Sequence, residues 1–158
     1  MTDLFVELKK HEAQKLPYVV YCKPNSDRVV GVFQNTDELY FLENFDEKGF
    51  VFAPFDGDKR PYIPQEKSDV YVEKIHAVDY FFETKIETKI DKKAKETFGN
   101  LVSKAIDCIS KSIFEKVVVS RKENYELKNF DTEIAFKKML FFYPNAFKYC
   151  FYHPKIGK

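Results

Sequence analysis

The chain has 158 residues, of which 44% are apolar and 17% aromatic, and it contains no tryptophan. This length and composition are typical of one folded domain with a sizeable core, and they exclude an intrinsically disordered chain. The 26 basic and 25 acidic residues nearly cancel, so no long-range field favours a nucleic acid or an anionic membrane as a partner.

The cysteines indicate a reducing compartment, whereas the histidines bear on a metal site and the hydropathy pattern on a membrane segment. The three cysteines are odd in number and widely spaced, and the three histidines are isolated from them and from one another. Neither a disulfide framework nor a zinc site is predicted, and we expect the histidines at the surface. The amino terminus lacks a basic region followed by an apolar core, and no apolar run approaches the roughly 20 residues that cross a bilayer. We therefore expect a cytoplasmic protein without a membrane segment.

The first half of the chain predicts one helix followed by a sheet. Leu4, Phe5 and Leu8 recur at helical spacing within residues 3–15, and Pro17 ends the pattern. Extended segments follow, separated by turn-forming clusters. They are residues 18–22, 28–34, 39–42 and 50–55. Because no helix intervenes, we expect an antiparallel meander.

The middle of the chain predicts a loop, a strand, a connector and a long helix. Residues 56–68 read as a loop and residues 70–75 as a strand, and the near-repeat at 84–91 reads as an exposed connector. Asp91 is a plausible cap for a helix whose apolar residues recur at three- and four-residue steps. This amphipathic pattern extends from Ala94 to Ile109.

A lysine then precedes a run of three valines, which favours a buried strand. The motif reads Lys116-Val117-Val118-Val119-Ser120-Arg121. A lysine at the mouth of a buried strand can lose part of its hydration, and a lysine that is neutral at rest can act as a base. The alternative interpretation is a strand-end charge that extends to solvent.

The last segments predict a helix and a second strand. Asp131 is a cap candidate for a helix that ends near Phe142, and residues 146–153 alternate as a half-buried strand. The aromatic residues Phe147, Tyr149 and Phe151 share one face of this strand, which indicates core rather than a cofactor site. The Lys116 and Phe147 strands can lie side by side only if the Asp131 helix packs across the sheet.

Several of these segments resemble the chorismate-utilising enzymes. Residues 98–106 together with the Lys116 motif are similar to that family's helix followed by Lys-Val-Val-Leu-Ser-Arg. Residues 143–147 and 153–157 resemble the stretch before its Gly-Ala-Thr-Pro-Glu motif. The front half of the chain resembles the family more loosely, at residues 48–55. Within the family, the chain most resembles the menaquinone-type isochorismate synthases. Two mild departures are Val119, where leucine is usual, and Ser112, where a glycine commonly separates helix from strand.

The resemblance implies an α+β fold, mainly an antiparallel sheet with packed helices, as part of the chorismate-utilising enzyme fold. It divides the chain into an amino-terminal sheet region at 1–83, a connector at 84–91 and the start of the chorismate-binding catalytic region at 92–158.

The resemblance also implies a magnesium-dependent reaction for menaquinone biosynthesis. In this reaction, water adds to one ring carbon of chorismate while the hydroxyl at another leaves, which gives isochorismate. Lys116 matches the family's water-activating base, and Arg121 takes no catalytic role because strict alternation along a strand turns it to the opposite face.

The Gly-Ala-Thr-Pro-Glu motif does not occur among the 158 residues. The resemblance therefore predicts an amino-terminal piece of an enzyme, without the family's catalytic acid and magnesium-binding glutamates and inactive alone. We expect no magnesium on this piece and self-association through the unpaired strand at 146–153.

Other functions remain open at this point. Salicylate synthases share the lysine, whereas the anthranilate and aminodeoxychorismate synthases commonly lack it. From a different class comes a non-catalytic α+β binding module in which Lys116 is structural.

Overall fold

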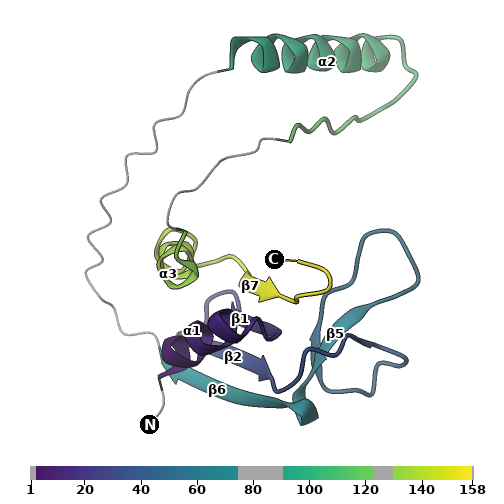
Figure 1. Ribbon diagram of the computed structural model, residues 1–158. Helices are drawn as coiled ribbons and strands as arrows, with labels where there is room; N and C mark the ends of the chain where they lie inside the picture. The colour runs from purple at the N-terminus through teal and green to yellow at the C-terminus, as the bar shows by residue number, and fades with distance from the viewer. Residues whose placement is uncertain (1–2, 75–90, 123–129, 158) are drawn as a thin grey trace. The chain divides into compact units, whose positions relative to one another are not determined.

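The computed structural model describes residues 3–74, 91–122 and 130–157 (Figure 1). These residues belong to two compact units, one made of Met1–Tyr80 with Phe130–Lys158 and the other of Phe81–Asn129. The first unit is an α+β structure with a four-stranded antiparallel sheet. None of the helices among the described residues is both long enough and apolar enough to cross a bilayer.

Helix α1 spans Leu4–Gln14, as its sequence pattern predicts. The Asp3 side chain caps it by accepting a hydrogen bond of 2.8 Å from the Phe5 N–H. The helix ends at Lys15, which adopts a left-handed conformation with φ 55°, and Pro17 follows two residues later. A cap at each end and an apolar stripe facing the sheet therefore define α1.

The main sheet has the strand order β6-β2-β1-β7, with every neighbouring pair antiparallel. Its strands are β1 (Tyr18–Cys22), β2 (Arg28–Gln34), β6 (Ser68–Lys74) and β7 (Lys148–Tyr152). Tyr18 lies opposite Phe33 on β2 and opposite Tyr152 on β7. The predicted strands at 18–22 and 28–34 are confirmed, as is the antiparallel pairing. The last strand of the chain thus borders the first.

A second, smaller sheet has the order β3-β5-β4. Its strands are β3 (Tyr40–Phe41), β4 (Gly49–Val51) and β5 (Pro61–Pro64). The predicted loop at 56–68 is therefore wrong in part, because it contains β5 and the short 3-10 helix η1 (Gln65–Lys67). Pro61 and Pro64 stand at the two ends of β5, where a missing N–H costs the ladder least. The prediction of a single antiparallel meander is also wrong, because the strands belong to two separate sheets.

Helix α3 spans Thr132–Phe142 and begins at the predicted cap, where the Asp131 side chain accepts from the Ile134 N–H at 2.9 Å. Helices α1 and α3 cover the same face of the main sheet (Figure 1). An apolar core lies between them and the sheet. Its buried residues are Leu4, Leu8, Tyr18, Val20, Cys22, Val29, Phe33 and Phe136.

The opposite face of the main sheet carries a smaller core. Val19, Val32 and Phe151 pack there against Ile63 of the small sheet, and Phe50 covers their edge. Alternate residues of β1 therefore belong to different cores, and the strand is buried on both sides.

Polar contacts join α1 to the start of α3. The Glu12 carboxylate accepts hydrogen bonds from the Tyr18 hydroxyl at 2.9 Å and from the Thr132 hydroxyl at 2.5 Å. Glu133 pairs with Lys9 of α1 at 2.5 Å and with Lys137 one turn along α3. Burial acts to raise the pKa of Glu133, but the hydrogen bonds from Lys137 and Lys9 outweigh it, so the pKa is lowered.

In the second unit, helix α2 spans Lys92–Ser110, and the Asp91 side chain caps it by accepting from the N–H groups of Lys93 and Ala94. The predicted helix and its cap are confirmed. None of the residues of α2 is buried, although its apolar residues follow helical spacing. The amphipathic pattern therefore describes a face that the described residues cover only in part.

The predicted strand around Lys116 is wrong for the described conformation. Residues 116–122 belong to no helix or strand, and Val118 is 81% exposed. Three β-branched residues favour an extended backbone, but a strand also needs a neighbour with which to exchange main-chain hydrogen bonds. No described segment provides that neighbour.

Replacement of Phe136 by alanine should lower the free energy of unfolding by about 3–5 kcal/mol, because Phe136 is fully buried where α3 meets α1 and the sheet. Urea denaturation followed by circular dichroism measures this loss. Ile134→Ala on the same helix is the matched control, because Ile134 is 49% exposed and should lose far less. Equal losses in the two variants would contradict this packing of α3.

Candidate functional site

Lys116 lies in the irregular segment that follows α2. The turn out of the helix passes through Ser112, whose φ of 55° is the left-handed conformation that glycine adopts most easily. This is the position at which the resemblance expects a glycine. The Lys116 side chain is exposed, so in the described conformation its ammonium group keeps its water.

The same segment returns to the amino-terminal half of α2. The Arg121 guanidinium lies 5.9 Å from the centre of the Phe98 ring, which is within the range of a cation–π contact. A cleft of about 420 Å³ lies beside this contact, and we call it the α2 cleft. It is lined by Asp91, Lys93, Ala94, Thr97, Phe98, Leu101, Ser120, Arg121 and Lys122.

The α2 cleft carries more positive than negative charge. Lys93, Arg121 and Lys122 line it with one acidic residue, Asp91, whose carboxylate already accepts two main-chain hydrogen bonds of α2. A guanidinium and two ammonium groups suit a small molecule that bears carboxylates. Lys116 does not line this cleft. The sequence assigned Arg121 no role, whereas the structure places it here.

No known protein family, curated protein or solved structure matches this chain. A function for this chain therefore has to be inferred from its own residues and their surroundings.

Among its described residues, the first unit also contains an apolar and a polar cleft, each of about 400 Å³. One is apolar, follows β7 and is called the β7 groove. It is lined by Phe52, Phe130, Tyr149, Cys150, Phe151, Ile156 and Gly157. The other is polar and is lined by Asp46, Glu47, Lys48, Tyr62, Pro64, Gln65 and Glu66.

In the polar cleft, an ionisable pair is mutually satisfied. Burial and a hydrogen bond to Glu47 raise the pKa of Tyr62 to about 12. The same hydrogen bond, with those from the Asn44 and Glu43 N–H groups, lowers the pKa of Glu47. A phenol held neutral beside an ionised carboxylate is a stable structural pair rather than an acid or base ready to react.

A magnesium site is implied by the family resemblance, but the described residues do not form one. Among residues 3–74, 91–122 and 130–157, no group of three or more histidine, cysteine, aspartate or glutamate side chains could hold a metal ion.

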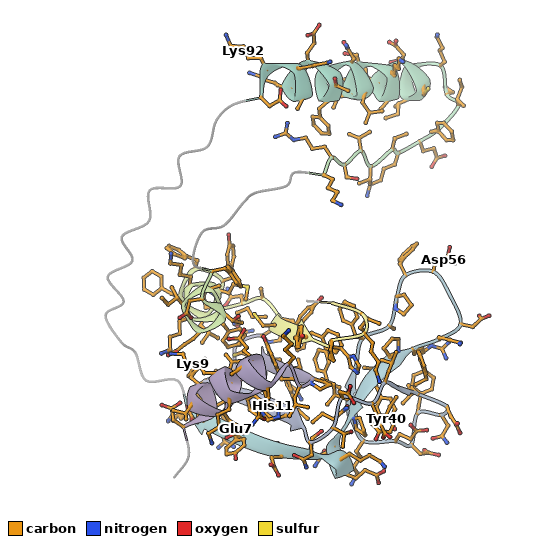
Figure 2. The ribbon with its side chains drawn as sticks, viewed as in Figure 1. Glu7, Lys9, His11, Tyr40, Asp56 and Lys92 are labelled. Carbon is orange, nitrogen blue, oxygen red and sulfur yellow. The ribbon has the colours of Figure 1, made fainter. Side chains whose placement is uncertain are left out.

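Two histidines are buried, which corrects the expectation that they lie at the surface. His11 is 4% exposed and His153 is 1% exposed, whereas His76 lies outside the described residues. The His11 ring lies between α1 and β2. Its Nδ1 is 3.3 Å from the Glu7 carbonyl oxygen, and its Nε2 is 3.2 Å from the Gln34 carbonyl oxygen. Figure 2 labels His11 and Glu7. Because residues 4, 8 and 11 share one side of α1, the helical spacing could have placed His11 in the core.

His153 closes the turn after β7. Its Nε2 donates to the Glu38 carbonyl at 3.1 Å, and its Nδ1 accepts from the Lys155 N–H at 3.2 Å. Both contacts require the neutral imidazole with its proton on Nε2. His153 therefore joins the carboxyl-terminal turn to the loop before β3, and no signal in the sequence revealed that contact.

A buried lysine at the start of β7 lies opposite a buried thiol at the end of β1. Lys148 is 5% exposed, and its ammonium donates to the carbonyl groups of Tyr143 and Pro144 at 3.1 and 3.0 Å. Burial raises the pKa of the Cys22 thiol, although Lys148 acts to lower it. Because the thiol stays protonated at neutral pH, Cys22 is a packing residue rather than a nucleophile.

Burial, and to a lesser degree Lys155, lowers the pKa of His153 against the opposing effect of the Glu38 carbonyl. The unfolded chain, with an ordinary histidine pKa of about 6.5, therefore binds a proton at higher pH than the folded one. The stability that neutral His153 contributes is complete above that value and is lost as the pH falls below it. Urea midpoints should thus decline from neutral to mildly acidic pH, and His153→Gln should flatten this decline. An unchanged pH profile in the variant would contradict the assignment.

Proposed function

We propose that this chain carries the lysine-bearing part of a menaquinone-type isochorismate synthase. The reaction would be the magnesium-dependent, cytoplasmic conversion of chorismate to isochorismate. The observation that carries the proposal is the motif from Lys116 to Arg121, which follows a capped amphipathic helix as it does in the chorismate-utilising enzymes.

Lys116 would serve as the base. Its neutral amine would take a proton from water as the water oxygen bonds to one ring carbon of chorismate. The hydroxyl at another ring carbon would leave with a proton from an acid. A lysine can take this role only where the neutral amine is favoured, through burial or a neighbouring cation. The proposal therefore requires that Lys116 be covered in the working enzyme, although it is exposed in the described conformation.

The α2 cleft supports the proposal through its charge. Chorismate carries carboxylates, and the cleft places Lys93, Arg121 and Lys122 around an apolar wall that includes Phe98 and Leu101. Carboxylates and a ring together suit basic groups beside an aromatic face. In this arrangement Arg121 would bind a carboxylate, a role separate from that of Lys116.

If the chain is extended to full family length, Lys116→Ala should lower kcat by roughly 10²–10⁴, the usual share of a positioned base, while KM changes little. Lys116→Arg should not restore turnover, because a guanidinium stays protonated at working pH. Chromatographic measurement of isochorismate formed from chorismate with Mg²⁺ gives both numbers. Lys111→Ala, which removes an exposed lysine from the end of α2, is the control. Near-normal turnover in Lys116→Ala would mean that Lys116 is structural.

The 158-residue chain by itself should form no isochorismate from chorismate and Mg²⁺, because the resemblance assigns the acid and the metal ligands to motifs that this sequence does not contain. The same chromatographic assay tests this at high protein concentration. Product formation would mean that the acid lies among the 158 residues, and acidic positions would then be substituted one by one.

One observation favours a different class of function. The exposure of Lys116 and Val118 fits a non-catalytic α+β module in which this segment binds another molecule. Product analysis with the complete gene product discriminates between the classes. Isochorismate supports the proposal, salicylate or an aminated product indicates another chorismate-utilising enzyme, and the absence of any product supports the binding module.

A further inference from the structure

We propose that the open edge of β7 is a self-association surface, on which a second copy of this chain adds its own β7 in antiparallel orientation. The inference is independent of the proposed function, because it depends only on the main sheet of the first unit. It concerns the edge of the sheet at the opposite end from β6.

The hydrogen bonds of the sheet show which main-chain groups of β7 face outward. The Pro17 carbonyl accepts from the Gln34 N–H of β2 at 3.0 Å, so alternate residues of β1 from Pro17 onward face β2. The remaining residues of β1 face β7, and their register partners there are Tyr152, Cys150 and Lys148. The N–H and C=O groups of Tyr149 and Phe151 therefore point away from β1.

The turn after β7 shows that this edge accepts antiparallel pairing. The His153 N–H donates to the Gly157 carbonyl at 2.9 Å, and the Gly157 N–H donates to the His153 carbonyl at 2.7 Å. Because His153 is two residues beyond Phe151, these bonds lie on the outward edge. Within the described residues, the pairing stops there and no strand continues along Tyr149 and Phe151.

The two edges of the main sheet differ in their protection. Strand β6 carries two exposed charged residues, Asp69 and Lys74, whereas the Glu73 carboxylate accepts from the Leu4 N–H of α1. Exposed charges are a common means of blocking edge-to-edge pairing. Strand β7 has a single charged residue, Lys148, which is buried and bonded to two carbonyl groups. The β7 edge therefore has no comparable barrier to a second strand.

A second β7 is complementary to this edge. Antiparallel alignment about Cys150 places Tyr149 of one copy opposite Phe151 of the other, so each outward N–H, with its partial positive charge, meets an outward C=O. No exposed charged side chain of β7 meets its own copy. Phe147 and Tyr149, which are 47% and 42% exposed, and the apolar β7 groove beside them supply contact area.

The test uses proline to remove one outward N–H without touching the ladder between β1 and β7. Tyr149→Pro should abolish self-association of the full chain, as measured by sedimentation velocity over a concentration series. Tyr149→Ala keeps the N–H and should retain it with reduced affinity. Val72→Pro is the matched control, because Val72 is exposed and its N–H points outward on the β6 edge. It should leave self-association unchanged.

Circular dichroism verifies that each variant is folded. If Tyr149→Pro does not fold, Tyr149→Lys replaces it, because a charge on the edge should prevent pairing while the strand persists. Hydrogen exchange provides a second measurement, since the amides of Tyr149 and Phe151 should gain protection as the concentration rises. A chain that stays monomeric at every concentration would overturn the proposal, as would an equal loss of association in Val72→Pro and Tyr149→Pro.

Discussion

Burial of β1 on both faces is the constraint on which the first unit depends. Tyr18 and Val20 face the helices, whereas Val19 faces the small sheet. A strand buried in this way needs a hydrogen-bonding neighbour on each edge, because unpaired N–H and C=O groups lose water without compensation. Strand β2 supplies one neighbour from the adjacent sequence. Strand β7 supplies the other from the far end of the chain, and helix α3 is the element that brings it back.

The buried polar groups show how this return is stabilised. Two of the polar links join segments that are distant in sequence, namely Glu12 with Thr132 and His153 with the Glu38 carbonyl. Burial without such partners would cost each group its hydration. The side-chain oxygen of Gln34 is an exception, because it is buried without a partner among the described residues, while its Nε2 donates to Thr36 and Glu38. Those bonds organise the loop that His153 contacts.

The two units differ in what they offer chemically. The ionisable groups buried in the first unit are paired with main-chain or side-chain partners, which suits stability more than catalysis. The second unit has the opposite character, with Lys116 exposed and basic residues around an open cleft. A base that depends on the loss of water cannot be assembled by α2 and the segment after it alone, since nothing described there covers Lys116. The proposed chemistry therefore depends on what covers this segment.

Local patterns in the sequence determined the helices and the first two strands. The caps at Asp91 and Asp131 and the apolar spacing of α1 act within a few residues, so their effect does not depend on the rest of the fold. Pairing between distant segments was decided by the tertiary structure alone. Strand β5 forms despite a proline at each end because β3 and β4 pair with its two edges. The valines after Lys116 have no described strand beside them and form no strand. The same reason explains His153, because its burial depends on a loop more than a hundred residues away in sequence. Side-chain type and spacing act locally, but hydrogen-bonded strand partners and burial are properties of the assembled sheet.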